Sequence, residues 1–122
     1  MLPKDEQAPI DEKIEALLGK DPSTHGQTRA LAEGYKIWDA ELNRVYKALY
    51  ARLPASGKRQ LQATQRTWIT WRDSELKTID AIFATTDGAQ MYLPMRKSFR
   101  VDVIRTRTLA LQKLLEVGHE TA

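Results

Sequence analysis

The chain has 122 residues, of which 42% are hydrophobic and 29% are charged, and its formal net charge is +3. This length and composition are typical of one globular domain whose core is large enough to fold without a metal or a disulfide. The absence of cysteine excludes disulfides, thiolate metal sites and cysteine nucleophiles. No run approaches the roughly 20 apolar residues that a membrane-spanning helix needs.

The N-terminal segment, residues 1–9, is predicted to be a flexible lead-in because it contains two prolines and mixed charges. It is acidic and lacks the apolar stretch of a signal peptide. We therefore expect either a cytosolic protein or one whose leader has been removed. Residues 1–22 hold six acidic and three basic side chains, a net charge of −3, so the rest of the chain carries +6.

The first two helices are predicted from caps and apolar spacing. A short helix is expected over about residues 10–18, with Asp11 as its cap and Gly19 as its end. After a turn at residues 21–24, Ser23 or Thr24 is expected to cap the second helix. That helix should span about residues 25–53, because apolar residues recur at intervals of 4, 3, 4, 3 and 4: Leu31, Tyr35, Trp38, Leu42, Val45 and Leu49.

Two glycines and a proline modify the second helix. Gly26 and Gly34 should each weaken it by about 1 kcal/mol relative to alanine, so its first turns are expected to bend or fray. Pro54 should end it, because a residue that precedes proline avoids helical angles. The short connection at residues 55–57 then favours an antiparallel neighbour.

Two further long helices complete the expected fold. The third is predicted over residues 56–84, with one apolar side made of Leu61, Trp68, Ile69, Leu76, Ile79 and Phe83. After a turn at residues 85–88, the fourth is predicted from about residue 93 to 117–118, with an inner face made of Met91, Met95, Phe99, Val103, Ala110 and Leu114. The sequence therefore predicts an all-α protein: an antiparallel bundle of three long helices plus a short N-terminal helix, forming one helical domain over residues 10–118.

Polar residues interrupt the apolar pattern on the two central helices. Asp and Asn are unfavourable inside helices, so their presence needs a structural or functional reason. Pairing the helices across the turn at residues 54–57 predicts that Asp39 lies near Arg72 and that Asn43 lies near Gln65. The predicted polar cluster consists of Asp39, Asn43, Tyr46, Gln65, Arg72 and Asp73.

We interpret this cluster mainly as structural, since a buried ion pair with satisfied amide and hydroxyl partners fixes the register of two helices. A pocket or recognition groove is the functional alternative. Catalysis is the least favoured interpretation, because no nucleophile, metal cluster or histidine lies nearby. His25 and His119 are isolated, so we expect no metal site and no cofactor.

A second candidate surface combines an aromatic side chain with basic ones. It consists of Trp71, Arg66, Arg96, Arg100 and Arg107. Such a surface can bind a partner protein, a sugar or a single strand. The structural alternatives are an aromatic lid over the edge of the core and a solvated basic helix face. The sequence contains no recognisable nucleic-acid-binding motif, so no specific nucleic-acid partner is expected.

Three motifs together resemble a known family. They read Trp38-Asp39-x-Glu41-Leu42-Asn43-x-x-Tyr46, then Leu61-x-x-x-Gln65-Arg66-x-Trp68-x-x-x-Arg72-Asp73, and finally Arg107-Thr108-x-x-Leu111. Over about residues 24–116 they resemble a family of small secreted bacterial domains that includes the N-terminal domain of the lysozyme inhibitor LprI. Members often carry a cysteine where this chain has Ser74, Glu75 and Leu76, and a threonine where it has Ile104.

The resemblance implies a secreted or periplasmic, non-enzymatic helical binding protein, with a cell-wall hydrolase such as lysozyme as the implied partner. Common animal lysozymes are strongly basic, so a net positive inhibitor would need a local acidic patch for electrostatic steering. The acidic residues near the N-terminus offer one: Asp5, Glu6, Asp11, Glu12 and Glu15. The alternative is a structural or interaction module whose basic last helix binds an anionic envelope component or an acidic partner. The oligomeric state is left open.

Overall fold

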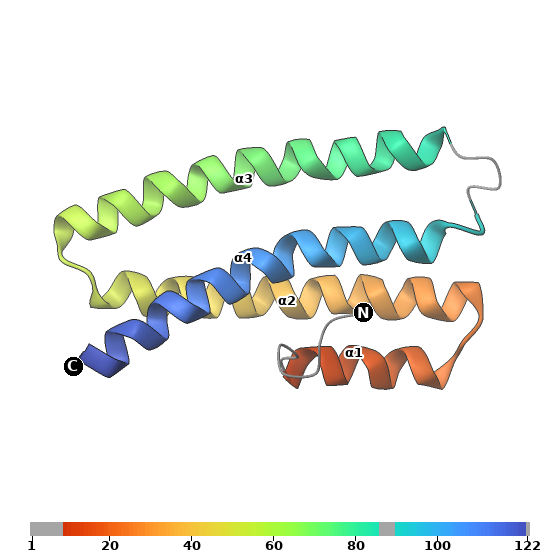
Figure 1. The fold of residues 1–122 in the computed structure, drawn as a ribbon, viewed down its shortest axis with the longest axis horizontal. Coiled ribbons are helices and arrows are strands. Elements are labelled where there is room, and N and C mark those ends of the chain that lie inside the picture. The colour runs from red at the N-terminus through yellow and green to blue at the C-terminus, as the bar shows by residue number, and fades with distance from the viewer. Residues whose placement is uncertain (1–8, 86–89, 122) are drawn as a thin grey trace.

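The structure, a computed structural model, describes residues 9–85 and 90–121, the last four by their backbone alone. Its four helices are α1 (Pro9–Lys20), α2 (Thr24–Arg52), α3 (Ala55–Ala84) and α4 (Leu93–Thr121). Figure 1 shows three long helices, with the short α1 beside one end of α2. The predicted all-α fold, an antiparallel bundle with a short N-terminal helix, is confirmed. The predicted lead-in and the turn before α4 fall largely outside the described residues.

The helices begin and end close to the residues predicted from the sequence, with three exceptions. Ser23 caps α2 as predicted, because its hydroxyl accepts a hydrogen bond of 3.0 Å from the Gly26 amide. Asp11 was wrongly predicted as a cap: α1 starts at Pro9, where proline fits the first helical position, and this places Asp11 inside the first turn. Gly19 does not end α1, which continues to Lys20. The predicted end of α4 was also wrong, since the helix continues to Thr121.

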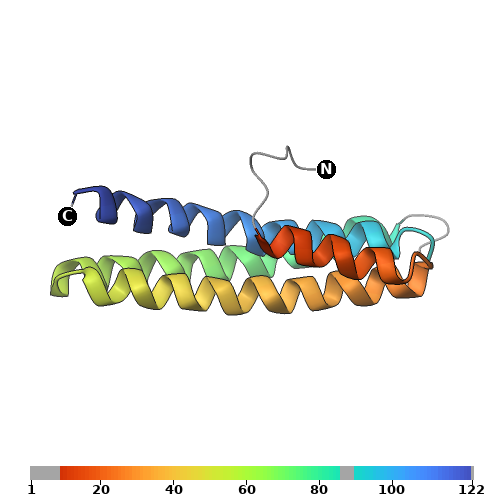
Figure 2. The same cartoon turned by 90° about the horizontal axis from the view of Figure 1, so that it is seen from below.

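The packing order of the helices differs from their order in the sequence. α4 packs mainly along α2, and α1 packs on α2 beside it, whereas α3 makes sparse contacts with both α4 and α2. In Figure 1, α4 runs between α3 and α2, and Figure 2 shows it along the upper edge of the bundle. Consecutive helices α2 and α3 are therefore close mainly near their connecting turn.

The core lies where α1, α2 and α4 meet. Its most buried apolar side chains are Ile14, Trp38, Leu42, Val45, Val101, Ile104, Leu111 and Leu115. α3 is described in full, and Ile79 is its only buried residue, although Leu61 and Trp68 pack partly against the core. Because apolar burial is the main stabilising term in folding, α3 is the element that the core holds least.

The predicted inner face of α4 was wrong. Met91, Met95, Phe99 and Leu114 are between 51% and 74% exposed, and Ala110 is exposed as well. The buried face instead carries Val101, Ile104, Arg105, Thr108, Leu111 and Leu115. This face escaped prediction because it contains two polar residues. Thr108 can be buried since its hydroxyl donates to the Ile104 carbonyl at 2.8 Å within the helix. On α3, Ile69 was likewise predicted to face inward and is exposed.

Candidate functional site

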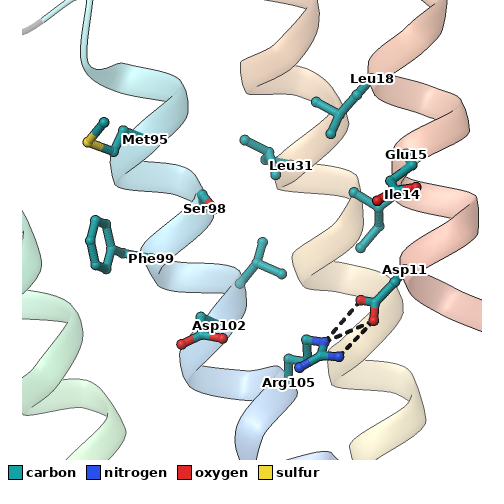
Figure 3. A pocket seen from close by; sticks show the side chains of 11 residues that line it. Asp11, Ile14, Glu15, Leu18, Leu31, Met95, Ser98, Phe99, Asp102 and Arg105 are labelled. Carbon is teal, nitrogen blue, oxygen red and sulfur yellow. Dashed lines mark hydrogen bonds and ion pairs between the residues drawn. The ribbon is translucent and has the colours of Figure 1, made fainter. Parts of the chain in front are cut away.

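A groove with a volume of about 740 Å³ lies between α1 and the first half of α4. We call it the α1/α4 groove. Figure 3 shows its two walls and the ion pair at one end. It is lined by Asp11, Ile14, Glu15, Leu18, Leu31, Met95, Ser98, Phe99, Val101, Asp102 and Arg105. Most of the lining is apolar, as it is in most small-molecule and cofactor sites.

The position of α1 depends on a close approach to α2. A Cβ atom on Gly34 would lie 2.8 Å from Cδ1 and 3.0 Å from Cγ1 of Ile14, closer than unbonded carbon atoms pack. Gly34 is therefore a packing residue, and not simply a weak point in α2. Its missing side chain lets Ile14 pack into the core, and this fixes the wall of the groove that α1 provides.

A buried ion pair joins α1 to the middle of α4. The Arg105 guanidinium donates to both carboxylate oxygens of Asp11, from Nε at 3.0 and 3.1 Å and from Nη2 at 2.8 Å. The two residues are only 6% and 9% exposed, and the guanidinium lies 5.6 Å from the ring centre of Trp38. This bidentate geometry is the strongest form of an arginine–carboxylate contact. The pair therefore positions α1 against α4.

The charges around the groove are mainly negative. Asp11 and Arg105 form an ion pair at one end, and the carboxylates of Glu15 and Asp102 are exposed on the two walls. An apolar groove with an acidic rim suits a partner that presents apolar and basic side chains. Within residues 9–85 and 90–117, we find no group of three His, Cys, Asp or Glu side chains that could hold a metal ion.

The predicted contact between Asp39 and Arg72 is absent from the structure. Arg72 instead donates to its neighbour Asp73, at 2.9 and 3.1 Å, and lies over the ring of Trp68. Within the part of the chain that the structure describes, the side chains of Asp39 and Asn43 have no hydrogen-bond partner, and Asn43 is exposed. The prediction failed because it assumed that α2 and α3 pack face to face.

The remaining members of the predicted polar cluster have other contacts. Gln65 does not meet Asn43, because its side-chain oxygen accepts hydrogen bonds of 3.0 and 3.1 Å from Arg107 of α4. Tyr46 is half-buried and stacks on Tyr50, with ring centres 6.1 Å apart. The predicted cluster is therefore split between contacts within single helices and contacts with α4.

The predicted aromatic and basic surface is also divided. Trp71 is 49% exposed, but Arg66 lies five residues away, about 140° around the helix. Arg96 and Arg100 face α3, where they donate to Asp80 at 2.8 and 3.3 Å. Arg107 faces α3 as well, and burial lowers its pKa, although a guanidinium stays protonated at neutral pH. These three arginines tie α3 to α4.

The ion pairs of Asp80 should make stability depend on pH. Although partial burial tends to raise it, the pKa of Asp80 lies below its ordinary value of 3.8 because Arg96 donates a hydrogen bond and Arg96 and Arg100 are positively charged. A carboxylate whose pKa is lowered by folding stabilises the protein above about pH 4, and this contribution is lost as the pH falls through the folded-state pKa.

We therefore expect Asp80→Asn to lower the free energy of unfolding near neutral pH by up to about 1 kcal/mol. The effect stays small because the side chain is 38% exposed and solvent screens the pair. Urea unfolding of both proteins at about pH 7 and about pH 2.5 measures it, and the difference should shrink at the lower pH. An equal difference at both pH values would contradict this assignment.

The α1/α4 groove was not predicted from the sequence. Asp11 was interpreted as a cap and as part of an acidic patch, and Arg105 was not among the candidate residues. One signal could have revealed Arg105: it adjoins the residues that recur at intervals of 3, 4, 3 and 4, namely Val101, Ile104, Thr108, Leu111 and Leu115. A cation beside an apolar stripe requires a buried anion, and the acids of the first helix are the nearest supply.

Comparisons with known proteins place this bundle in a family. A family model described as lysozyme inhibitor LprI matches residues 19–111, which include α2, α3 and the larger part of α4. The crystal structure of an uncharacterised protein from Burkholderia thailandensis is similar over 90% of this chain, with a TM-score of 0.81 and 31% sequence identity. This chain covers 55% of that longer protein. No curated protein matches. Because the family model matches well over half of its length, the chain belongs to the lysozyme inhibitor LprI family.

Proposed function

We propose that this chain is a non-enzymatic, secreted or periplasmic protein that binds and inhibits a cell-wall hydrolase of the lysozyme type, and that the α1/α4 groove is its recognition surface. Membership of the LprI family supports the inhibitor role. The observation that carries the choice of surface is the groove itself: about 740 Å³, mostly apolar, and bordered by exposed carboxylates. The structure describes no helix that is long and apolar enough to cross a membrane.

The distribution of charge supports binding of a basic partner despite the net charge of +3. Three arginines of α4, Arg96, Arg100 and Arg107, are directed to α3 and engaged there. The side of α4 that borders the groove instead carries Asp102, opposite the α1 carboxylates. A basic hydrolase would therefore meet a locally negative surface, and long-range attraction would raise its association rate.

The alternative function, binding of an anionic envelope component by the basic last helix, has less support. Its arginines Arg96 and Arg100 already pair with Asp80, and Arg105 is buried against Asp11. Charges that are engaged within the bundle contribute less to a surface potential than free ones do.

The direct test is the rate at which a lysozyme degrades cell walls, with and without the purified protein. We expect inhibition that weakens with added salt, because salt screens attraction between surface charges. Ser98→Trp should abolish it, since Ser98 is exposed on the wall of the groove and an indole would fill the space. Ser74→Trp, the same change at an exposed position of α3, is the matched control and should leave inhibition intact.

Charge reversal at Glu15 tests the electrostatic attraction of the hydrolase separately from the shape of the groove. Glu15→Lys should slow association with a basic hydrolase several-fold, because rim charges act mainly on the association rate. Absence of inhibition by the wild-type protein at about 50 µM, where even weak complexes form, would remove lysozyme as the target. Equal inhibition by Ser98→Trp and wild type would remove the groove as the surface.

A further inference from the structure

The outward face of α4 carries a second apolar stripe that is largely exposed, although the Phe99 ring contacts Phe83 of α3, with ring centres 5.9 Å apart. Its members are Met95, Phe99, Val103, Ala110, Leu114 and Val117, which we call the α4 stripe. Four of them are 51–59% exposed, and the face is opposite the fully buried Ile104. In Figure 2, the C-terminal half of α4 lies along the upper edge of the bundle with no other helix above it, whereas α1 and the end of α3 overlap its N-terminal half. A run of large exposed apolar side chains on one helix face indicates an interaction surface.

The α4 stripe is symmetric about its own centre. Its members form three pairs at matching distances from the midpoint between Thr106 and Arg107: Val103 with Ala110, Phe99 with Leu114, and Met95 with Val117, the last pair offset by one residue. The small residues lie at the centre and the large ones lie toward both ends. Two such helices, packed antiparallel around a two-fold axis at the midpoint, would approach closely at the centre and interlock their large side chains outside it.

Charges beside the stripe obey the same symmetry. Asp102 and Lys113 are both exposed, lie on the same flank of the stripe and are nearly equidistant from the midpoint. Within one chain they are eleven residues apart, about 16 Å along the helix, so they do not pair with each other. Among the described residues, neither has an ion-pair partner. The two-fold axis would place Asp102 of each copy beside Lys113 of the other.

We propose that the partner of the α4 stripe is a second copy of this chain, docked antiparallel around a two-fold axis near Thr106 and Arg107. The stripe covers about 33 Å of helix, and a strip of that length and about 15 Å width buries on the order of 500 Å² per copy. The total of about 1,000 Å² lies at the lower limit for specific interfaces. The dimer is therefore weak, with a dissociation constant in the micromolar range. Because Met95, Phe99 and Asp102 also line the α1/α4 groove, a second copy docked here would compete with a target of that groove.

Sedimentation equilibrium of the full chain, from about 1 to 500 µM, tests the proposal across the micromolar range. The wild-type protein should change from monomer to dimer over this range. Leu114→Glu should remain monomeric, because it places two carboxylates in the apolar contact. Ile82→Glu is the matched control: Ile82 is 60% exposed on α3, so this variant should dimerise as the wild type does. Circular dichroism checks that both variants keep their helices.

Exchange of the two flanking charges tests the antiparallel geometry. Asp102→Lys alone and Lys113→Asp alone should each weaken the dimer by about tenfold, because each places like charges opposite one another twice per dimer. The double variant should restore wild-type affinity, since it rebuilds both ion pairs with reversed signs. A wild-type protein that stays monomeric at about 500 µM, or a double variant as weak as the single ones, would overturn the proposal.

Discussion

Replacement of Arg105 by leucine is expected to lower the free energy of unfolding by about 3–5 kcal/mol. The guanidinium is 6% exposed and donates three hydrogen bonds to the Asp11 carboxylate. Its removal leaves a buried carboxylate without that cation, and a buried charge that has lost its partner is among the most destabilising defects in a folded protein. Urea unfolding followed by circular dichroism measures the loss as a shift of the midpoint.

The matched control is the double variant Asp11→Leu with Arg105→Leu. A buried ion pair can be replaced by apolar side chains at little cost, because the desolvation of both charges is then avoided. We expect the double variant to recover most of the stability that the single one loses. Equal losses in the two proteins would show that the pair acts through packing on Trp38 and Ile14, and would contradict the electrostatic explanation.

The ion pair also connects stability with the proposed function. α1 supplies one wall of the α1/α4 groove, and Asp11 is its link to the middle of α4. In Arg105→Leu, α1 should detach before the rest of the bundle unfolds, because local elements open in order of their own stability. Inhibition of the hydrolase should then be lost under conditions where α2 and α4 stay folded, whereas the double variant should retain it.

The helices were predictable because their signals are local. The apolar spacing of α2 and the cap at Ser23 depend on neighbours in the sequence, and the structure agrees with both. The arrangement of the helices was less predictable, since α4 carries apolar residues on two opposite faces. Spacing alone cannot decide which face is buried, and the face with more aromatic and methionine residues is the exposed one.

The candidate site was hardly predictable, because it joins residues 94 positions apart in the chain. The sequence contains Asp11 and Arg105, but only the packing of α1 and α4 side by side on α2 brings them together. The prediction of a polar cluster around Asp39 and Arg72 was wrong for the opposite reason. Helices that follow each other in the sequence were assumed to be neighbours, and α4, not α3, occupies that side of α2.

Substitution of Trp38 is expected to have the second large effect on the free energy of unfolding. It is 1% exposed and lies where α2, α4 and the Arg105 guanidinium meet. Trp38→Ala should lower the free energy of unfolding by about 3–5 kcal/mol, because it leaves a large cavity in a core that has few other elements to fill it. Circular dichroism in urea is the suitable measurement, since Trp68 and Trp71 would complicate a fluorescence signal.

Trp38→Phe distinguishes the volume of this side chain from its polar group. The indole N–H is buried and has no hydrogen-bond partner among the described residues, a situation that costs about 1–3 kcal/mol. Phenylalanine gives up part of the packing volume but removes the unsatisfied donor, so the two effects oppose each other. We expect a net change within about 1 kcal/mol. A loss as large as that of Trp38→Ala would mean that the N–H is satisfied in solution, and that the ring acts through its hydrogen bond as well as through its size.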